Sequence, residues 1–199
     1  MLRIYHTAVA GGNVLSVEGV FSAPDESNYE GRSGETVAKK LFIAPAQTTL
    51  VTGINSSAVD LVIAHPIFFN TKYRKIIIDS EVMTIIAGFG TTLLTVTRGD
   101  SPASHAADAA IYAAYTYDSI TLAASDESGD DESGWLTYAP DSGGSPGSYV
   151  SSLSPTSMTD PTSDSYTFWR KIIVPASTAA TRNATLRHKL TYNATEYAA

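Results

Sequence analysis

Short runs in which apolar and polar residues alternate predict a chain built from β-strands. In residues 165–174 (SYTFWRKIIV) and 185–194 (TLRHKLTYNA), successive side chains fall on opposite faces, which is the period of a strand. Clusters of Gly, Pro, Asn and Ser, which favour turns, separate such runs. Further strand-like segments cover residues 14–20, 36–44, 48–54, 58–64, 115–124 and 135–139. The pattern therefore predicts an all-β fold.

The most regular pattern lies in residues 73–112. Two strand-like segments, residues 74–87 and 91–97, flank a Gly-Phe-Gly turn, and a short loop containing His105 follows the second. This order predicts a β-meander that is closed by a fixed turn. By contrast, residues 22–35 and 140–161 are rich in Ser, Gly, Pro and Asp, and we expect them to form exposed surface excursions.

Asp79 and Glu81 are the first candidates for chemistry. They are two residues apart, so within one strand their carboxylates would share a face. Two carboxylates on one face can act as a general acid and a general base. They can equally form the solvent-facing side of a hairpin, and we favour this second interpretation.

Composition and charge narrow the classes of function. Hydrophobic residues make up 43% and charged residues 17% of the 199 residues, as in an ordinary globular protein. The net charge of −7 disfavours extended binding to nucleic acid or to anionic lipid. The sequence has no cysteine, which excludes disulfides, thiolate metal sites and thiol nucleophiles. The first residues show only a broken apolar run, so we expect neither an export signal nor a membrane span.

Other candidate sites are weaker. Residues 125–134 (SDESGDDESG) carry oxygen ligands that suit calcium, but their spacing is not that of an EF-hand, and we favour an exposed acidic loop. Arg98-Gly99-Asp100 spells the integrin-binding tripeptide, but its Arg and Gly are explained by the predicted turn. His188 is expected at the edge of the core. The sequence has no motif for nucleotide binding, a catalytic nucleophile or zinc, so we expect no catalytic residue, no cofactor and no metal site.

Residues 73–112 also resemble a small β-module that recurs in virion proteins of tailed phages, especially in tail, baseplate and fibre-associated parts. The pattern is a strand, Ile-Asp-x-Glu, a second strand, Leu-x-Thr-Val-Thr-Arg-Gly, a loop with a His, and a final strand. Between the Arg-Gly and the His, this chain has Asp-Ser-Pro-Ala-Ser where relatives usually carry a longer loop with a Gly-Thr pair. The residues that carry the resemblance are Ile78, Asp79, Glu81, Leu93, Thr95, Val96, Thr97, Arg98, Gly99, His105, Ala109 and Ile111.

The polar residues of this pattern have a physical role that does not depend on the resemblance. Arg98 offers a planar fork that matches a carboxylate through two hydrogen bonds, and Asp79 or Glu81 is the available partner. Gly99 would permit a left-handed turn, and His105 could hydrogen-bond the turn backbone. We therefore predict a structural turn that Asp79, Glu81, Arg98, Gly99 and His105 pin together.

The predicted architecture is an antiparallel, immunoglobulin-like β-sandwich with an inserted small β-barrel or meander domain. Residues 1–48 and 113–199 would form the sandwich, and residues 49–112 the insertion, because insertion at a surface loop costs little free energy. A tandem of two or three small domains is the alternative. The segment Tyr-x-Phe-Trp-Arg-Lys-x-x-Val-Pro, with the strand after it, resembles the final two strands of immunoglobulin-like sandwiches in phage structural proteins. Both of its faces are largely apolar, so we expect burial on two sides or contact with a partner.

The resemblance implies a non-enzymatic virion protein of a tailed phage, in several symmetric copies. A tail, baseplate or fibre-adaptor part is favoured, and a capsid decoration protein or a carbohydrate- or receptor-binding module is the alternative. The 11 tyrosines and 2 tryptophans could supply stacking surfaces for sugars. The expected partners are copies of the chain and other virion proteins, with no nucleic acid and no membrane. Assembly would take place in the host cytoplasm, and the protein would end in the virion.

Overall fold

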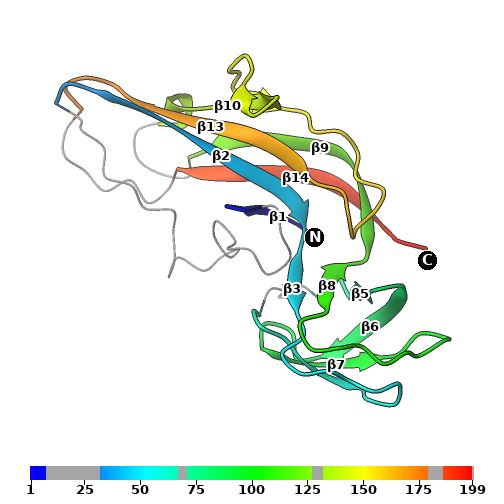
Figure 1. Ribbon diagram of the computed structural model, residues 1–199. Helices are drawn as coiled ribbons and strands as arrows, with labels where there is room; N and C mark the ends of the chain where they lie inside the picture. Colours follow the sequence, from blue (N-terminus) through cyan, green and yellow to red (C-terminus); the bar gives the residue numbers. More distant parts are fainter. Residues whose placement is uncertain (8–31, 67–70, 127–131, 179–185, 199) are drawn as a thin grey trace.

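The computed structural model describes residues 1–7, 32–66, 71–126, 132–178 and 186–198 (Figure 1). Within these ranges the chain forms 14 β-strands and one short 3-10 helix, η1 (Ser133–Trp135). The strands pair antiparallel in every sheet. The predicted all-β fold with antiparallel sheets is confirmed. In the part of the chain that the structure describes, no helix has the length and apolar character needed to cross a membrane.

Two sheets face each other as a sandwich in the upper part of Figure 1. The larger sheet has the order β1-β2-β13-β10-β11, and the smaller one has the order β12-β9-β14. Buried side chains from both sheets, such as Leu41, Phe168 and Leu122, fill the space between them. The strands of the larger sheet are β1 (Leu2–Tyr5), β2 (Glu35–Pro45), β10 (Leu136–Ser142), β11 (Ser145–Pro146) and β13 (Tyr166–Val174). Those of the smaller sheet are β9 (Tyr115–Ser125), β12 (Ser152–Leu153) and β14 (Arg187–Glu196).

The third sheet is built from the chain between β2 and β9. Its order is β3-β8-β5-β6-β7-β4, and it curls until an antiparallel bridge between Leu50 and Ile63 links its two edge strands. Its interior is filled by aliphatic side chains such as Ile76, Ile85 and Leu94. We call this unit the module. Its strands are β3 (Gln47–Thr49), β4 (Asp60–Val62), β5 (Lys75–Ile78), β6 (Glu81–Ala87), β7 (Leu93–Thr97) and β8 (Ala110–Ala113).

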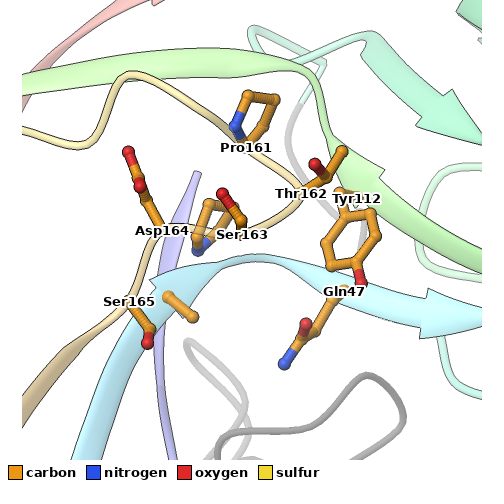
Figure 2. A pocket seen from close by; sticks show the side chains of 9 residues that line it. Gln47, Tyr112, Pro161, Thr162, Ser163, Asp164 and Ser165 are labelled. Carbon is orange, nitrogen blue, oxygen red and sulfur yellow. The ribbon is translucent and has the colours of Figure 1, made fainter. Parts of the chain in front are cut away.

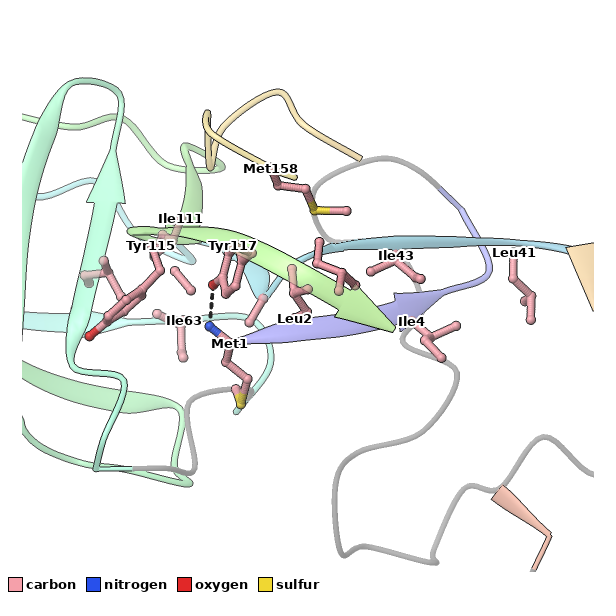
Figure 3. Packing of buried hydrophobic residues seen from close by; sticks show 14 of the residues in the cluster. Met1, Leu2, Ile4, Leu41, Ile43, Ile63, Ile111, Tyr115, Tyr117 and Met158 are labelled. Atoms are coloured by element: carbon pink, nitrogen blue, oxygen red, sulfur yellow. Dashed lines mark hydrogen bonds between the residues drawn. The ribbon is translucent and has the colours of Figure 1, made fainter. Parts of the chain in front are cut away.

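The module joins the sandwich through a buried junction. The hydroxyl of Tyr115, at the start of β9, accepts hydrogen bonds from the backbone N–H groups of Arg74 and Lys75 at 2.9 and 3.1 Å. The ring of Tyr73 meets the ring of Tyr115 edge to face, with 5.3 Å between centroids. Figure 3 shows the Met1 amino group bonded to the Tyr117 hydroxyl, within a cluster that also includes Ile63 and Ile111 of the module. Sandwich and module thus share one continuous core.

The structure corrects two expectations about strands. Residues 74–87 are not one strand, because the chain reverses at Asp79 and Ser80 and forms the β5–β6 hairpin. β13 is not buried on two sides, because Phe168 and Arg170 face the core while Ile173 on the opposite face is exposed. The alternative, that this second face meets a partner, stays a prediction.

Most of residues 140–152 are exposed, as expected, but residues 140–161 are also tied to both sheets of the sandwich. Bridges join Val150 to Tyr138 and Met158 to Tyr117, and the side chains of Leu153 and Met158 are buried. The predicted strand at residues 14–20, and nearly all of the predicted excursion at residues 22–35, lie outside the described residues. The division into a sandwich and an independent domain at residues 49–112 stays a prediction.

Replacing Tyr115 by Phe tests the junction. The change removes the acceptor of two backbone N–H groups, and we expect the free energy of unfolding to fall by about 1–3 kcal/mol, measured by denaturant titration. Tyr112→Phe is the control, because the structure shows no hydrogen bond to the Tyr112 hydroxyl within the described ranges, and a change below about 0.5 kcal/mol is expected there. Equal losses in the two variants would contradict a specific role for Tyr115.

Candidate functional site

The polar residues of the resemblance meet where the β5–β6 hairpin touches the loop after β7. Asp79 occupies the hairpin turn with a left-handed backbone (φ 53°), which Asp adopts more easily than most residues. Glu81 opens β6 and is buried, whereas the Asp79 side chain is 69% exposed. The two carboxylates therefore do not share a solvent-facing side of one strand, and that part of the prediction is wrong.

Arg98 is bound through all of its side-chain donors. Its Nε and Nη2 donate to the two oxygens of Glu81, both at 2.7 Å, in the two-handed geometry that a guanidinium offers a carboxylate. Its Nη1 donates to the carbonyls of Asn55 and Ala58 at 3.0 and 2.8 Å, and Nη2 also donates to the carbonyl of Ala103 at 2.5 Å. A guanidinium has five N–H groups, so none is left for another partner.

Glu81 is equally occupied. Beside the two bonds from Arg98, its Oε2 accepts the backbone N–H of Ala103 at 2.9 Å and lies 3.0 Å from Nε2 of His105. The hydrogen bonds from Arg98 outweigh burial and lower the pKa of Glu81 to about 2, and the same pairing raises the pKa of Arg98. A buried carboxylate that is held ionised in this way is a fixed structural charge rather than a group that exchanges protons near neutral pH.

His105 connects the two carboxylates. Its Nδ1 lies 2.7 Å from Oδ2 of Asp79, and its Nε2 faces Glu81. Carboxylate oxygens only accept, so the ring can donate to both only when both nitrogens carry hydrogen. The expected bond from the His105 ring to the turn backbone is not what the structure shows: the backbone of His105, not its ring, pairs with Ile54.

Gly99 has a different role from the predicted one. It is not among the residues with positive φ, so the expected left-handed turn is absent there. A Cβ atom at this position would lie 2.7 Å from the carbonyl oxygen of Val82, which is too close for any side chain. Gly99 thus allows the loop after β7 to pass directly against β6, where Arg98 reaches Glu81.

We call Asp79, Glu81, Arg98 and His105 the polar cluster. It ties together the β5–β6 hairpin, the loop at residues 55–58 and the loop at residues 98–105. The side chains of Arg98, Glu81 and His105 are only 7%, 5% and 2% exposed, so the centre of the cluster is covered. An acid–base pair must reach the proton that it transfers, and this arrangement leaves only Asp79 accessible. The buried guanidinium also removes Arg98 from the surface that an integrin-type receptor would read.

A small hollow lies between the module and the sandwich (Figure 2). It has a volume of about 50 Å³, which holds one or two water molecules, whereas small-molecule sites in proteins measure roughly 300–1,000 Å³. Gln47 and Tyr112 line one side of it, and the loop at residues 161–165 lines the other. The hollow therefore suits a bound water better than a substrate.

The remaining candidates do not converge on a site. Nδ1 of His188 lies 3.1 Å from the hydroxyl of Tyr138, at the edge of the core as expected. Across the described ranges, no three His, Asp or Glu side chains are placed to hold a metal ion. Much of the acidic segment at residues 125–134 lies outside the described residues.

Comparisons with protein-family models, with curated proteins and with solved structures gave no match.

Sequence reasoning missed the carbonyl partners of Arg98, which belong to Asn55, Ala58 and Ala103. Every residue has a backbone carbonyl, so the residue type does not show which carbonyl accepts a bond. The one signal in the sequence was that Arg98 has more N–H donors than a single carboxylate can accept.

Removing Arg98 tests whether the cluster is structural. Arg98→Ala leaves Glu81 as a buried charge without its partner, and we expect a loss of about 3–5 kcal/mol in the free energy of unfolding. Arg74→Ala is the matched control, because Arg74 is exposed and, among the described residues, its side chain bonds only the carbonyl of Thr71, so its loss is expected below about 0.5 kcal/mol. An Arg98→Ala protein as stable as the wild type would refute the pinned turn.

The low pKa of Glu81 predicts how stability depends on acid. The folded-state pKa lies below the ordinary value of 4.5, so the stabilisation is complete above about pH 4.5 and is lost as the pH falls towards 2. We expect a loss on the order of 3 kcal/mol from this group over that window, measured by denaturant titration at each pH. Glu81→Gln should be less stable at pH 7 but should lose less on acidification. Identical slopes in the two proteins would contradict the assignment.

Proposed function

We propose that this chain is a non-enzymatic structural protein of a tailed-phage virion, assembled in several symmetric copies as a tail, baseplate or fibre-adaptor part. The polar cluster carries the proposal. The residues that resemble the phage module, and that looked most capable of chemistry, form a covered network in which Arg98 uses all five donors. Such a network stabilises a loop and leaves little polar capacity for a substrate.

The connection between the two units supports a structural role. The chain leaves the sandwich after β2 and returns at β9, so two strands cross the junction side by side. Tyr115 and Tyr117 fix these crossings through hydroxyl contacts with the module backbone and with Met1. An arrangement of this kind transmits force between units better than a single flexible linker. The immunoglobulin-like character of the sandwich is part of this proposal.

The proposed partners are copies of the same chain and other virion proteins, with neither nucleic acid nor a membrane as a ligand. The net charge of −7 supports the exclusion of nucleic acid, because backbone phosphates repel an acidic chain. Assembly in the host cytoplasm and a final place in the virion belong to the same proposal.

A carbohydrate-binding module is the second candidate, and one observation favours it. Lys40, Trp169, Ala139 and Tyr149 follow one another across the outer face of the larger sheet, as the strand registers and the Tyr138–Val150 bridge require. Trp169 is held there by a 2.8 Å hydrogen bond from its Nε1 to Asp141. Two aromatic rings beside polar groups can stack on sugar rings.

Purified particles of the phage that encodes the chain test the proposal. Mass spectrometry should find the protein at a fixed stoichiometry, and electron microscopy with an antibody should place it on the tail, baseplate or fibre attachment. Labelling over the whole capsid would instead identify a decoration protein. Absence from particles, with binding of the isolated chain to a glycan array that Trp169→Ala abolishes, would replace the proposal by the second candidate.

A further inference from the structure

A row of exposed aliphatic residues crosses the outer surface of the module. The Leu50–Ile63 bridge places Val51 beside Val62, and the β4–β7 register places Val62 beside Leu93. Their exposed fractions are 50%, 39% and 52%, whereas the inward-facing neighbours Leu50 and Ile63 are buried. We call Val51, Val62 and Leu93 the aliphatic row.

The aliphatic row departs from the usual alternation in a sheet that has one face on the core and the other in water. Outward positions of a curled antiparallel sheet are normally polar, because they face water. Ile86, the extra residue at the bulge of β6, adds a fourth exposed aliphatic side chain on the next strand. Asp60 lies two residues before Val62 on the same outer face, where its Oδ1 accepts a hydrogen bond from Thr95. The surface is thus aliphatic with an acidic flank, and clustered exposed aliphatic residues mark contact sites.

A second apolar surface lies on the sandwich. Along β13, Trp169, Lys171 and Ile173 share the outer face, and Ile173 is exposed. The ammonium of Lys171 lies 3.9 Å from the centre of the Tyr149 ring. The same face carries Lys40 and Asp141, which form a 3.3 Å ion pair beside Trp169. This surface is therefore aromatic and aliphatic, with Lys171 as a cation next to a neutral ion pair, on a chain whose net charge is −7.

The two surfaces are complementary in charge, but they cannot cover each other within one molecule. The aliphatic row belongs to the module at the lower end of Figure 1, and the outer face of β13 belongs to the upper sheet of the sandwich. Contact between them therefore requires a second copy. A contact between two different surfaces is heterologous, and its repetition builds rings or filaments.

We propose that copies of this chain bind head to tail, with the aliphatic row of one copy on the outer face of β13 in the next copy and Asp60 facing Lys171. The inference rests on the proposed function as a protein of several symmetric copies, and it names the surfaces that make the contact. Four aliphatic side chains cover less than the roughly 800 Å² per partner of a stable pairwise interface. Each contact is weak alone, and closure of a ring adds to its stability.

Sedimentation velocity on the purified full chain, from low to high micromolar concentration, tests the contact. The wild type should associate reversibly beyond a dimer. Leu93→Asp should stay monomeric, while Thr97→Asp, an exposed position on the same face of β7 but away from the row, should associate as the wild type does. Circular dichroism melting checks that each variant is folded. Monomeric wild type at every concentration, or equal effects of the two variants, would overturn the proposal.

Charge reversal tests the head-to-tail arrangement. Asp60→Lys and Lys171→Glu should each weaken association, because each places like charges across the contact. The two reversals combined in one chain should restore association, and so should an equimolar mixture of the two single variants, in which every contact again joins opposite charges. Loss of association by Leu93→Asp without any restoration by charge reversal would indicate a module-to-module contact and would overturn the proposal.

These outcomes are independent of the particle experiment. A protein that is found in particles but stays monomeric would refute the head-to-tail contact and leave the proposed function intact. A protein that associates as described but is absent from particles would refute the proposed function and leave the contact intact.

Discussion

The buried pair of Arg98 and Glu81 is the interaction on which the module depends. A buried ion pair is favourable only when its remaining donors and acceptors are satisfied, since both charges have left water. Here the carbonyls of Asn55, Ala58 and Ala103 take the donors that Glu81 does not. Two loops, at residues 55–58 and 98–105, are thereby fixed against β6. The charged groups of Arg98 and Glu81 therefore bond the loops of the module itself. For this reason they offer few free donors or acceptors to a substrate.

The junction extends this rigidity to the sandwich. Tyr115 lies at the first position of β9, and its hydroxyl bonds the module just before and at the start of β5. Burial raises the pKa of this hydroxyl, so it keeps its proton over the physiological range. Met1 and Tyr117 pack into the same cluster from the sandwich side (Figure 3). The two units therefore meet in a packed and hydrogen-bonded junction, although each has its own sheet.

The all-β fold and the members of the polar cluster could be predicted from the sequence, because alternation and the Ile-Asp-x-Glu and Thr-Arg-Gly patterns are local signals. The hairpin turn at Asp79 could not be predicted, because residues 74–87 contain neither Gly nor Pro to mark a turn. Asp79 itself takes the left-handed conformation there. The role of Gly99 was also hidden, because its close contact with Val82 depends on how the loop after β7 passes over β6 in three dimensions. The aliphatic row was missed because strand pairing, seen in the Leu50–Ile63 bridge and the bond from the Val51 N–H to the Val62 carbonyl, is what makes its members neighbours.

Rigidity gives the proposed head-to-tail contact its geometric consequence. If sandwich and module moved freely, the angle between the aliphatic row and the outer face of β13 would vary. Each copy would then be rotated by a different angle relative to the copy before it. The bonds from Arg74 and Lys75 to Tyr115 restrain that angle at the junction, as the proposed contact requires. A heterologous contact with a constant rotation closes into a ring when the rotation divides a full turn and otherwise continues as a helix. In the proposed assembly, the polar cluster holds the loops of the module, the junction holds the module on the sandwich, and the two exposed surfaces set the rotation between copies.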